Sequence, residues 1–143
     1  MADLSITPKD VRALEGAIVT TANAGEAMSV GDLVYLETDG DWNKTDADTG
    51  TTLTGTLGIV VAGSGNGGLP NSAGTIANGE RITVLLFGRV NLNVTLSAKV
   101  QYFASNTAGK ISNTVGTVTR RIGSAETTDG IFFFNPNTTA ATS

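Results

Sequence analysis

The stretch RITVLLFGRVNLNVTL, residues 81–96, has the hydrophobic pattern that determines the class of fold. Residues 81–87 are rich in apolar side chains and predict one strand. Gly88 permits a bend, and from Val90 to Leu96 every second residue is apolar. A period of two is typical of a strand with one buried face and one polar face. The stretch therefore predicts β-structure on both sides of the bend.

The composition extends this prediction to the whole chain. Its 143 residues fit one domain. Charged residues make up only 15%, against roughly 25% in an average soluble domain. The polar surface comes instead from residues such as the 22 threonines, and 18 glycines punctuate the chain. Because Thr favours strands and Gly favours turns, we expect an all-β fold, a small barrel or sandwich of many short strands.

Other short apolar segments predict the remaining strands. The segments at residues 57–62 and 131–134 are unbroken apolar runs, which indicates strands buried on both faces. The dipeptides Asp39-Gly40, Asn78-Gly79 and Asp129-Gly130 predict turns. The further strands are expected at residues 17–20, 33–36, 42–45, 100–103, 110–112 and 115–122.

The two halves of the chain share one order of motifs. Val34-Tyr35-Leu36 and Gln101-Tyr102-Phe103 each precede a turn and a short return strand, and Leu57-Gly58 corresponds to Ile122-Gly123. Tyr35 and Tyr102 lie 67 positions apart, whereas Gly58 and Gly123 lie 65 apart, so the spacing barely drifts. We therefore expect two similar antiparallel units, of which only the first carries a long loop.

The N-terminal segment allows two interpretations. Thr7-Pro8-Lys9-Asp10 has the residues of a helix start, with Thr7 as N-cap and Pro8 as first helical residue. Alternatively, the segment stays extended, because Leu4 and Ile6 alternate with polar residues. The expected organisation is an N-terminal arm at 1–16, a β domain at 17–134 with a long loop at 63–80, and a flexible tail at 135–143.

Several classes of function are disfavoured by residue content. The chain has no Cys and no His, which excludes thiol catalysis, Ser-His-Asp systems and zinc sites of the Cys/His type. No apolar run approaches the ~20 residues of a membrane span, and no signal-peptide pattern is present. The sequence has no basic stripe of the kind that indicates nucleic-acid binding. We expect no enzyme activity, no cofactor, no membrane or nucleic-acid partner, and a chain folded in the cytoplasm where it is made.

Two motifs suggest chemistry only superficially. Residues 39–43 open like a calcium-binding loop, but Lys44 and Gly50 stand where Gly and a bidentate Glu are required. A hairpin turn explains the acidic residues between Asp39 and Asp48 more simply, although calcium binding stays open. The glycine-rich residues 63–68 lack the ending of a phosphate-binding loop.

The aromatic residues raise one further possibility. Trp42, Tyr35 and Tyr102 could stack on a sugar or a base. Their positions in or beside predicted strands favour packing instead. A glycan-binding or adhesive β-module on a virion or cell surface is therefore kept as the alternative function.

The order of several short motifs resembles that of tailed-bacteriophage head decoration (capsid cement) proteins. The similar pieces are MADLSIT (1–7), AGEAMSVGDLVY (24–35), KTDAD (44–48), LGI (57–59), GRV (88–90), QYF (101–103) and IG (122–123). The resemblance implies a non-enzymatic protein that binds the outer surface of an icosahedral head, forms homotrimers and ties major capsid protein subunits together. The loop at 63–80 and the short connection before Ile131 depart from the family pattern.

This resemblance leads to expectations about the interface. Residues 2–7 could add a strand to an exposed edge of a capsid sheet, because backbone hydrogen bonds need no particular side chains. The expected capsid or subunit contacts are Leu4, Ile6, Asn66, Leu69 and Asn71. The chain is expected on the outer surface of the virion capsid, where it would stabilise the shell.

Overall fold

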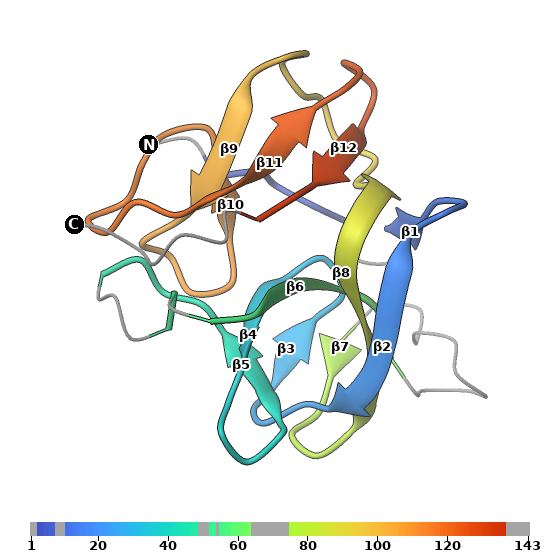
Figure 1. The fold of residues 1–143 in the computed structure, drawn as a ribbon, viewed down its shortest axis with the longest axis vertical. Helices are drawn as coiled ribbons and strands as arrows, with labels where there is room; N and C mark the ends of the chain where they lie inside the picture. Colours follow the sequence, from blue (N-terminus) through green and yellow to red (C-terminus); the bar gives the residue numbers. More distant parts are fainter. Residues whose placement is uncertain (1–2, 8–10, 49–51, 54, 64–74, 137–143) are drawn as a thin grey trace.

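The computed structural model describes residues 3–7, 11–48, 52–53, 55–63 and 75–136. These residues contain strands and no helix, so the all-β prediction is confirmed. The strands are β1 (Arg12–Ala13), β2 (Ile18–Asn23), β3 (Met28–Ser29), β4 (Leu33–Leu36), β5 (Trp42–Lys44), β6 (Leu57–Gly63), β7 (Thr75–Ile76), β8 (Arg81–Asn91), β9 (Gln101–Ala104), β10 (Ile111–Ser112), β11 (Arg121–Ala125) and β12 (Ile131–Phe134) (Figure 1).

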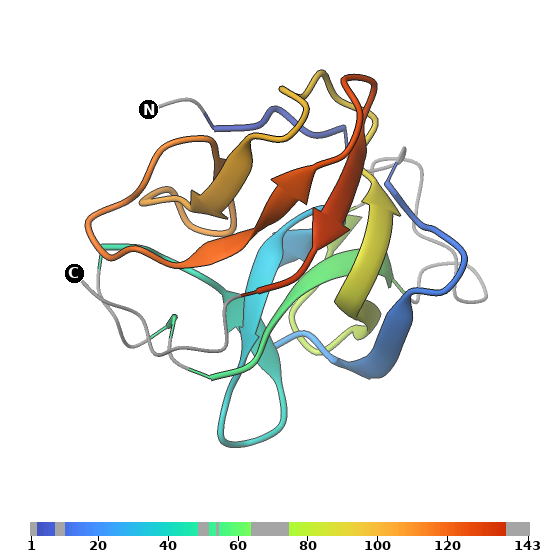
Figure 2. The same ribbon diagram turned by 45° about the horizontal axis from the view of Figure 1, so that its top comes forward.

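Ten of these strands form one curled antiparallel sheet. Its path runs β10-β9-β11-β12-β8-β6-β4-β5, and β1 and β2 also pair with β8. β3 and β7 form a separate two-stranded sheet. In both ribbon views the β9–β12 part lies above the part that contains β4, β5 and β6 (Figures 1 and 2). This curled antiparallel arrangement agrees with the expected barrel or sandwich class.

The sheet path repeats itself across its centre. One half is β5-β4-β6-β8 and the other is β10-β9-β11-β12, and the two halves join where β8 pairs with β12. In the first half β4 pairs with its short return strand β5 and with the third strand, β6, and β6 pairs with the fourth strand, β8. In the second half β9 pairs with its short return strand β10 and with the third strand, β11, and β11 pairs with the fourth strand, β12. The two expected antiparallel units are therefore present.

Both positions of the repeated motif require glycine for the same structural reason. A Cβ on Gly58 would collide with the side chain of Val84 on the neighbouring β8. A Cβ on Gly123 would collide with the carbonyl oxygen of Phe133 on the neighbouring β12. Each unit thus needs glycine on its third strand, where the fourth strand packs closely.

The two tyrosines of the repeated motif are not structural counterparts, because the strand registers of the two units differ by one residue. Gly58 pairs with Val34, whereas Gly123 pairs with Tyr102. Val34 is therefore the structural counterpart of Tyr102, and both are buried. Tyr35 points to the other side of its strand and is only half-buried. The reason is a register irregularity between Arg121 and Gly123, which the sequence spacing does not reveal.

β8 connects the two units because it bends in the middle. Its first half pairs with β6 and β2, and its second half pairs with β12 and β1. The bend falls at Gly88, which has a φ of +118°. A Cβ there would lie 2.9 Å from the Cα of Ala17, so glycine serves both the bend and this close approach. This positive φ agrees with the expectation that Gly88 permits a bend.

The ends of the curled sheet are bridged by the turn between β9 and β10. The N–H of Leu33 donates to the carbonyl of Gly109, and the N–H of Gly109 donates to the carbonyl of Thr45, each at 2.8 Å. The N–H of Ala47 donates to the carbonyl of Ser105 at 3.0 Å. These bonds bring the second unit against the first and give the molecule its rounded shape.

Some strand predictions are wrong in extent. The strand expected through Leu96 ends at Asn91, because the N–H of Leu92 donates to the carbonyl of Gly130 at 2.8 Å instead of continuing a ladder. Leu92 and Leu96 are nevertheless buried. The strand expected at residues 115–122 begins only at Arg121.

The loops and ends differ in how far they are described. β7 lies inside the expected long loop at 63–80, and β1 lies inside the expected arm at 1–16. The turn at Asn78-Gly79 is confirmed, since the N–H of Glu80 donates to the carbonyl of Ala77. Residues 64–74 of the loop and 137–143 of the tail lie outside the described residues.

Candidate interaction surface

The described part of the N-terminal arm lies along the edge of β10. Asp3 forms a bridge with Ser112, and the N–H of Leu4 donates to the carbonyl of Ile111 at 2.7 Å. The hydroxyl of Ser105 donates to Oδ1 of Asp3 at 2.6 Å. Residues 3–7 and 11–16 contain no helix, which favours the extended interpretation. Pro8, Lys9 and Asp10 of the alternative helix start lie outside the described residues.

Two of the expected interface residues lie on this arm. Leu4 and Ile6 are half-buried and pack against the chain's own core. A Cβ at Gly31 would lie 2.9 Å from Cγ2 of Ile6, so the arm is seated closely there. These side chains are thus partly occupied within the chain. The other three expected residues, Asn66, Leu69 and Asn71, lie outside the described residues.

A different surface carries exposed apolar side chains. We call Ile18, Phe87 and Phe133 the outer apolar patch. Ile18 lies opposite Phe87 across the β2–β8 pair, and the two are 55% and 41% exposed. The rings of Phe87 and Phe133 meet edge to face with centroids 5.3 Å apart. Three strands of the sheet therefore present one apolar surface.

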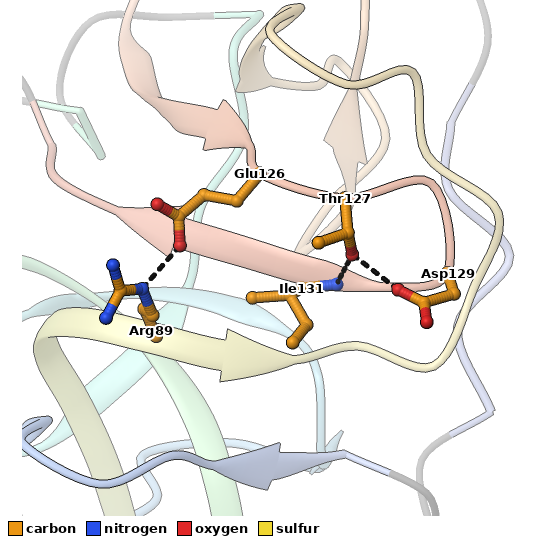
Figure 3. A network of polar contacts seen from close by, with 5 residues as sticks. All are labelled: Arg89, Glu126, Thr127, Asp129 and Ile131. Atoms are coloured by element: carbon orange, nitrogen blue, oxygen red, sulfur yellow. Dashed lines mark hydrogen bonds and ion pairs between the residues drawn. The ribbon is translucent and has the colours of Figure 1, made fainter.

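A polar network borders this patch at the β11–β12 turn (Figure 3). Arg89, which lies opposite Phe133, forms an ion pair with Glu126 at 2.5 Å. Its hydrogen bond to Glu126 raises the pKa of Arg89 above its usual value. The hydroxyl of Thr127 donates to Oδ1 of Asp129 at 2.5 Å and accepts the N–H of Ile131 at 3.1 Å. The patch thus has an apolar centre and a charged border.

The sequence pattern alone does not predict the outer apolar patch. Residues 131–134 were expected to be buried on both faces, which is wrong for one face. Phe132 and Phe134 are fully buried, but Ile131 and Phe133 are only half-buried. The alternation rule places Phe133 on the opposite face from its two neighbours, but it does not tell which of the two faces lies uncovered.

The acidic hairpin between Asp39 and Asp48 uses its carboxylates in turns. Oδ1 of Asp39 accepts the N–H of Asp41 at 3.0 Å, and Oδ1 of Asp46 accepts the N–H of Asp48 at 2.9 Å. Gly40 has a φ of +91°, as the expected turn requires. Among the described residues, no three acidic side chains lie close enough together to hold a metal ion.

The aromatic residues considered for sugar stacking pack inside the protein or against it. Trp42 and Tyr102 are each 2% exposed, so the packing interpretation is confirmed for both. Tyr102 also meets the ring of Phe132 edge to face. The hydroxyl of half-buried Tyr35 donates to Glu37 at 2.6 Å, and this bond raises the pKa of Tyr35.

Two buried charged groups hold loops together. Burial raises the pKa of Asp32, although its carboxylate accepts the N–H of Ser29 at 2.9 Å. Arg120 is 5% exposed and donates to the carbonyls of Leu53 and Gly55, while its Nε has no partner among the described residues. Burial lowers the pKa of Arg120. Both groups connect loops beside the sheet.

The chain matches no known protein-family model, and no curated protein is significantly similar to it. Within the part of the chain that the structure describes, no helix is long and apolar enough to span a membrane.

Proposed function

We propose that this chain is a capsid decoration protein that binds the outer surface of a bacteriophage head and stabilises the shell. Its partners would be the major capsid protein and further copies of itself, which the sequence resemblance implies as trimers. It would be made in the host cytoplasm and act on the virion. The order of motifs that resembles head decoration proteins supports this proposal, and so does the outer apolar patch.

The outer apolar patch is the observation on which the proposal rests. Its side chains come from β2, β8 and β12, whose backbones are fixed in one sheet. Fully burying a large apolar side chain contributes about 1.5–3 kcal/mol. Ile18 and Phe87 are about half exposed, so covering each would contribute roughly 1 kcal/mol. Each such contact is weak, but the stabilisation of the shell adds up over the many copies that bind it.

Binding of this kind stabilises a shell by mass action. A protein that binds only the expanded shell stabilises that state by about 2.7 kcal/mol per site at a concentration 100 times its Kd. The many sites on one head add their contributions. A rigid β-scaffold suits this role because little conformational freedom is lost on binding.

The N-terminal arm would contribute to shell binding only after leaving its present position. The arm occupies the edge of the chain's own β10 through Asp3 and Leu4. Before it could add a strand to a capsid sheet, it would have to leave this edge and uncover Leu4 and Ile6. Strand addition by residues 2–7 therefore stays a prediction, and the patch is the contact that needs no rearrangement.

Co-sedimentation with expanded heads of the phage that encodes the chain tests the proposal. Phe87→Ser and Ile18→Thr should each weaken binding by about fivefold, since roughly 1 kcal/mol is lost. Val115→Thr is the matched control, because Val115 is 52% exposed and lies outside the patch. Wild-type protein that remains in the supernatant would contradict the proposed function. Equal binding by all three variants would contradict the role of the patch.

A further inference from the structure

The outer edge of β2 is free of any pairing within the described residues. β2 pairs with β8 through its other edge along its full length, from Ile18 to Asn23. In Figure 1 it lies at the outside of the molecule, beside β8. An unpaired strand edge presents a row of N–H and C=O groups that can template another strand.

The two ends of the sheet path, in contrast, are covered by other segments. The edge of β10 is covered by Asp3 and Leu4 of the arm. The edge of β5 is covered by Ala24, which bridges Trp42, and by Gly25, whose N–H donates to the Trp42 carbonyl at 2.8 Å. Among the described residues, both ends of the sheet path are therefore covered, whereas the outer edge of β2 has no pairing partner.

The sequence of β2 contains none of the usual devices that prevent pairing. Ile18-Val19-Thr20-Thr21-Ala22-Asn23 has no charge and no proline, whereas exposed edges of natural sheets commonly carry Lys or Pro. Ile18 and Val19 are also among the exposed large apolar residues. A shift in register between these two residues limits the regular edge to residues 19–23.

The phase of the ladder shows which backbone groups point outward. The N–H of Ala24 donates to the carbonyl of Glu80 at 2.9 Å. In an antiparallel pair, every second residue exchanges hydrogen bonds with its partner strand. With this register, Thr20 and Ala22 face β8. The N–H and C=O groups of Val19, Thr21 and Asn23 therefore point to the free edge.

We propose that β2 pairs antiparallel with β2 of a second copy of this chain, about a two-fold axis at Thr21. In this register Thr21 lies opposite Thr21 of the second copy, and Val19 lies opposite Asn23. All three outward-pointing residues then find a partner, and no two like charges on β2 face each other. Opposed threonines are also a favourable cross-strand pair.

This contact goes beyond shell binding and does not require it. Strand pairing uses backbone groups at the edge, so Phe87 and Phe133 on the face of the sheet stay accessible. A two-fold contact joins copies in pairs and differs from the three-fold contact that the resemblance implies. Arg81 donates to the hydroxyl of Thr21 at 3.4 Å, so pairing brings two guanidinium groups near the axis. Added salt should therefore strengthen the dimer.

Single cysteines test the register, because the chain has no cysteine of its own. Opposed residues of a hydrogen-bonded pair have Cα atoms about 5.5 Å apart, which suits a disulfide. Thr21→Cys should therefore form a covalent dimer under mild oxidation. Asn23→Cys, on the same edge but displaced from the axis, should not, nor should Asn113→Cys on an exposed loop. Crosslinking of Asn23→Cys or Asn113→Cys as fast as Thr21→Cys would overturn the proposal.

The mass in solution, measured by light scattering without shells, tests the contact without a crosslink. The wild-type chain should approach twice its 14.6 kDa mass as concentration rises. Thr21→Lys should weaken the dimer by about tenfold or more by placing two charges at the axis. Asn113→Lys is the matched control and should behave as wild type. A wild-type mass of one chain at all concentrations, or a Thr21→Lys dimer as strong as wild type, would overturn the proposal.

Discussion

The two equivalent glycines allow the internal duplication to be tested by stability. A Cβ on Gly58 would meet the side chain of Val84, lie 3.0 Å from the carbonyl oxygen of Leu85 and lie 3.3 Å from the ring of Trp42. A Cβ on Gly123 would meet the carbonyl of Phe133. In both places backbone or core side chains would have to shift.

The expected cost follows from the physics of overpacking. Inserting a methyl group into a well-packed core costs about 1–3 kcal/mol, so Gly58→Ala and Gly123→Ala should each lower the free energy of unfolding by that amount. For a chain of this size the midpoint of thermal unfolding should fall by roughly 3–10 °C. Ser124→Ala, next to Gly123 but half-exposed, is the control and should change stability by less than about 0.5 kcal/mol.

Urea denaturation at 25 °C, followed by Trp42 fluorescence, measures these differences. The midpoint should move for both alanine variants while the slope stays constant, since the exposed area on unfolding does not change. Variants at Gly58 and Gly123 that are both as stable as wild type would refute the close approach of the third and fourth strands. A loss at one glycine alone would refute the structural equivalence of the two units.

Three further predictions concern the buried charges and the arm. Arg120→Ala should destabilise the fold by about 1–3 kcal/mol, because the carbonyls of Leu53 and Gly55 lose their donor; a urea midpoint equal to that of wild type would contradict this. Asp32 has a folded pKa raised above 3.8 by burial, so its charged form costs stability once the pH rises through that pKa. Asp32→Asn should therefore gain stability relative to wild type between pH 4 and pH 7, and a gain that grows toward low pH would show that the sign is wrong. Deleting residues 2–7 uncovers the β10 edge and should increase self-association by gel filtration; it should also weaken shell binding if the arm adds a strand to the capsid, whereas unchanged binding would refute that role.

The repeated pattern was predictable because it rests on local requirements. Alternation of apolar residues identified most strands, and the Asp39-Gly40 and Asn78-Gly79 turns follow from backbone preferences. The Leu57-Gly58 and Ile122-Gly123 pairs reported the same packing need in each unit. These patterns involve residues that are close in the sequence, so predicting them requires no knowledge of distant contacts.

The strand end at Asn91, the β3–β7 pair and the position of the arm depend on contacts between distant residues. Alternation from Leu92 to Leu96 reports burial but not a hydrogen-bonding partner, so it wrongly predicts a strand where the chain forms a buried loop. The pairing of β3 with β7 joins Met28 to Ile76 and left no local pattern. The hydrogen bond from Leu4 to Ile111 is likewise a contact between distant parts of the chain.

The sequence does not predict the outer apolar patch, for a related reason. An unbroken run such as residues 131–134 predicts burial on both faces only if another layer covers each face. Phe133 instead points outward beside Phe87, and which side lacks a cover depends on where β2 and β8 lie. The sequence pattern contains no direct signal for that arrangement.

Cryo-electron microscopy of the bacteriophage head that the proposed function requires tests the central claim most directly. The account predicts density outside the capsid lattice that fits the curled sheet, with Phe87 and Phe133 turned toward the major capsid protein. Heads that carry no such density, or bound copies whose outer apolar patch faces solvent, would contradict it.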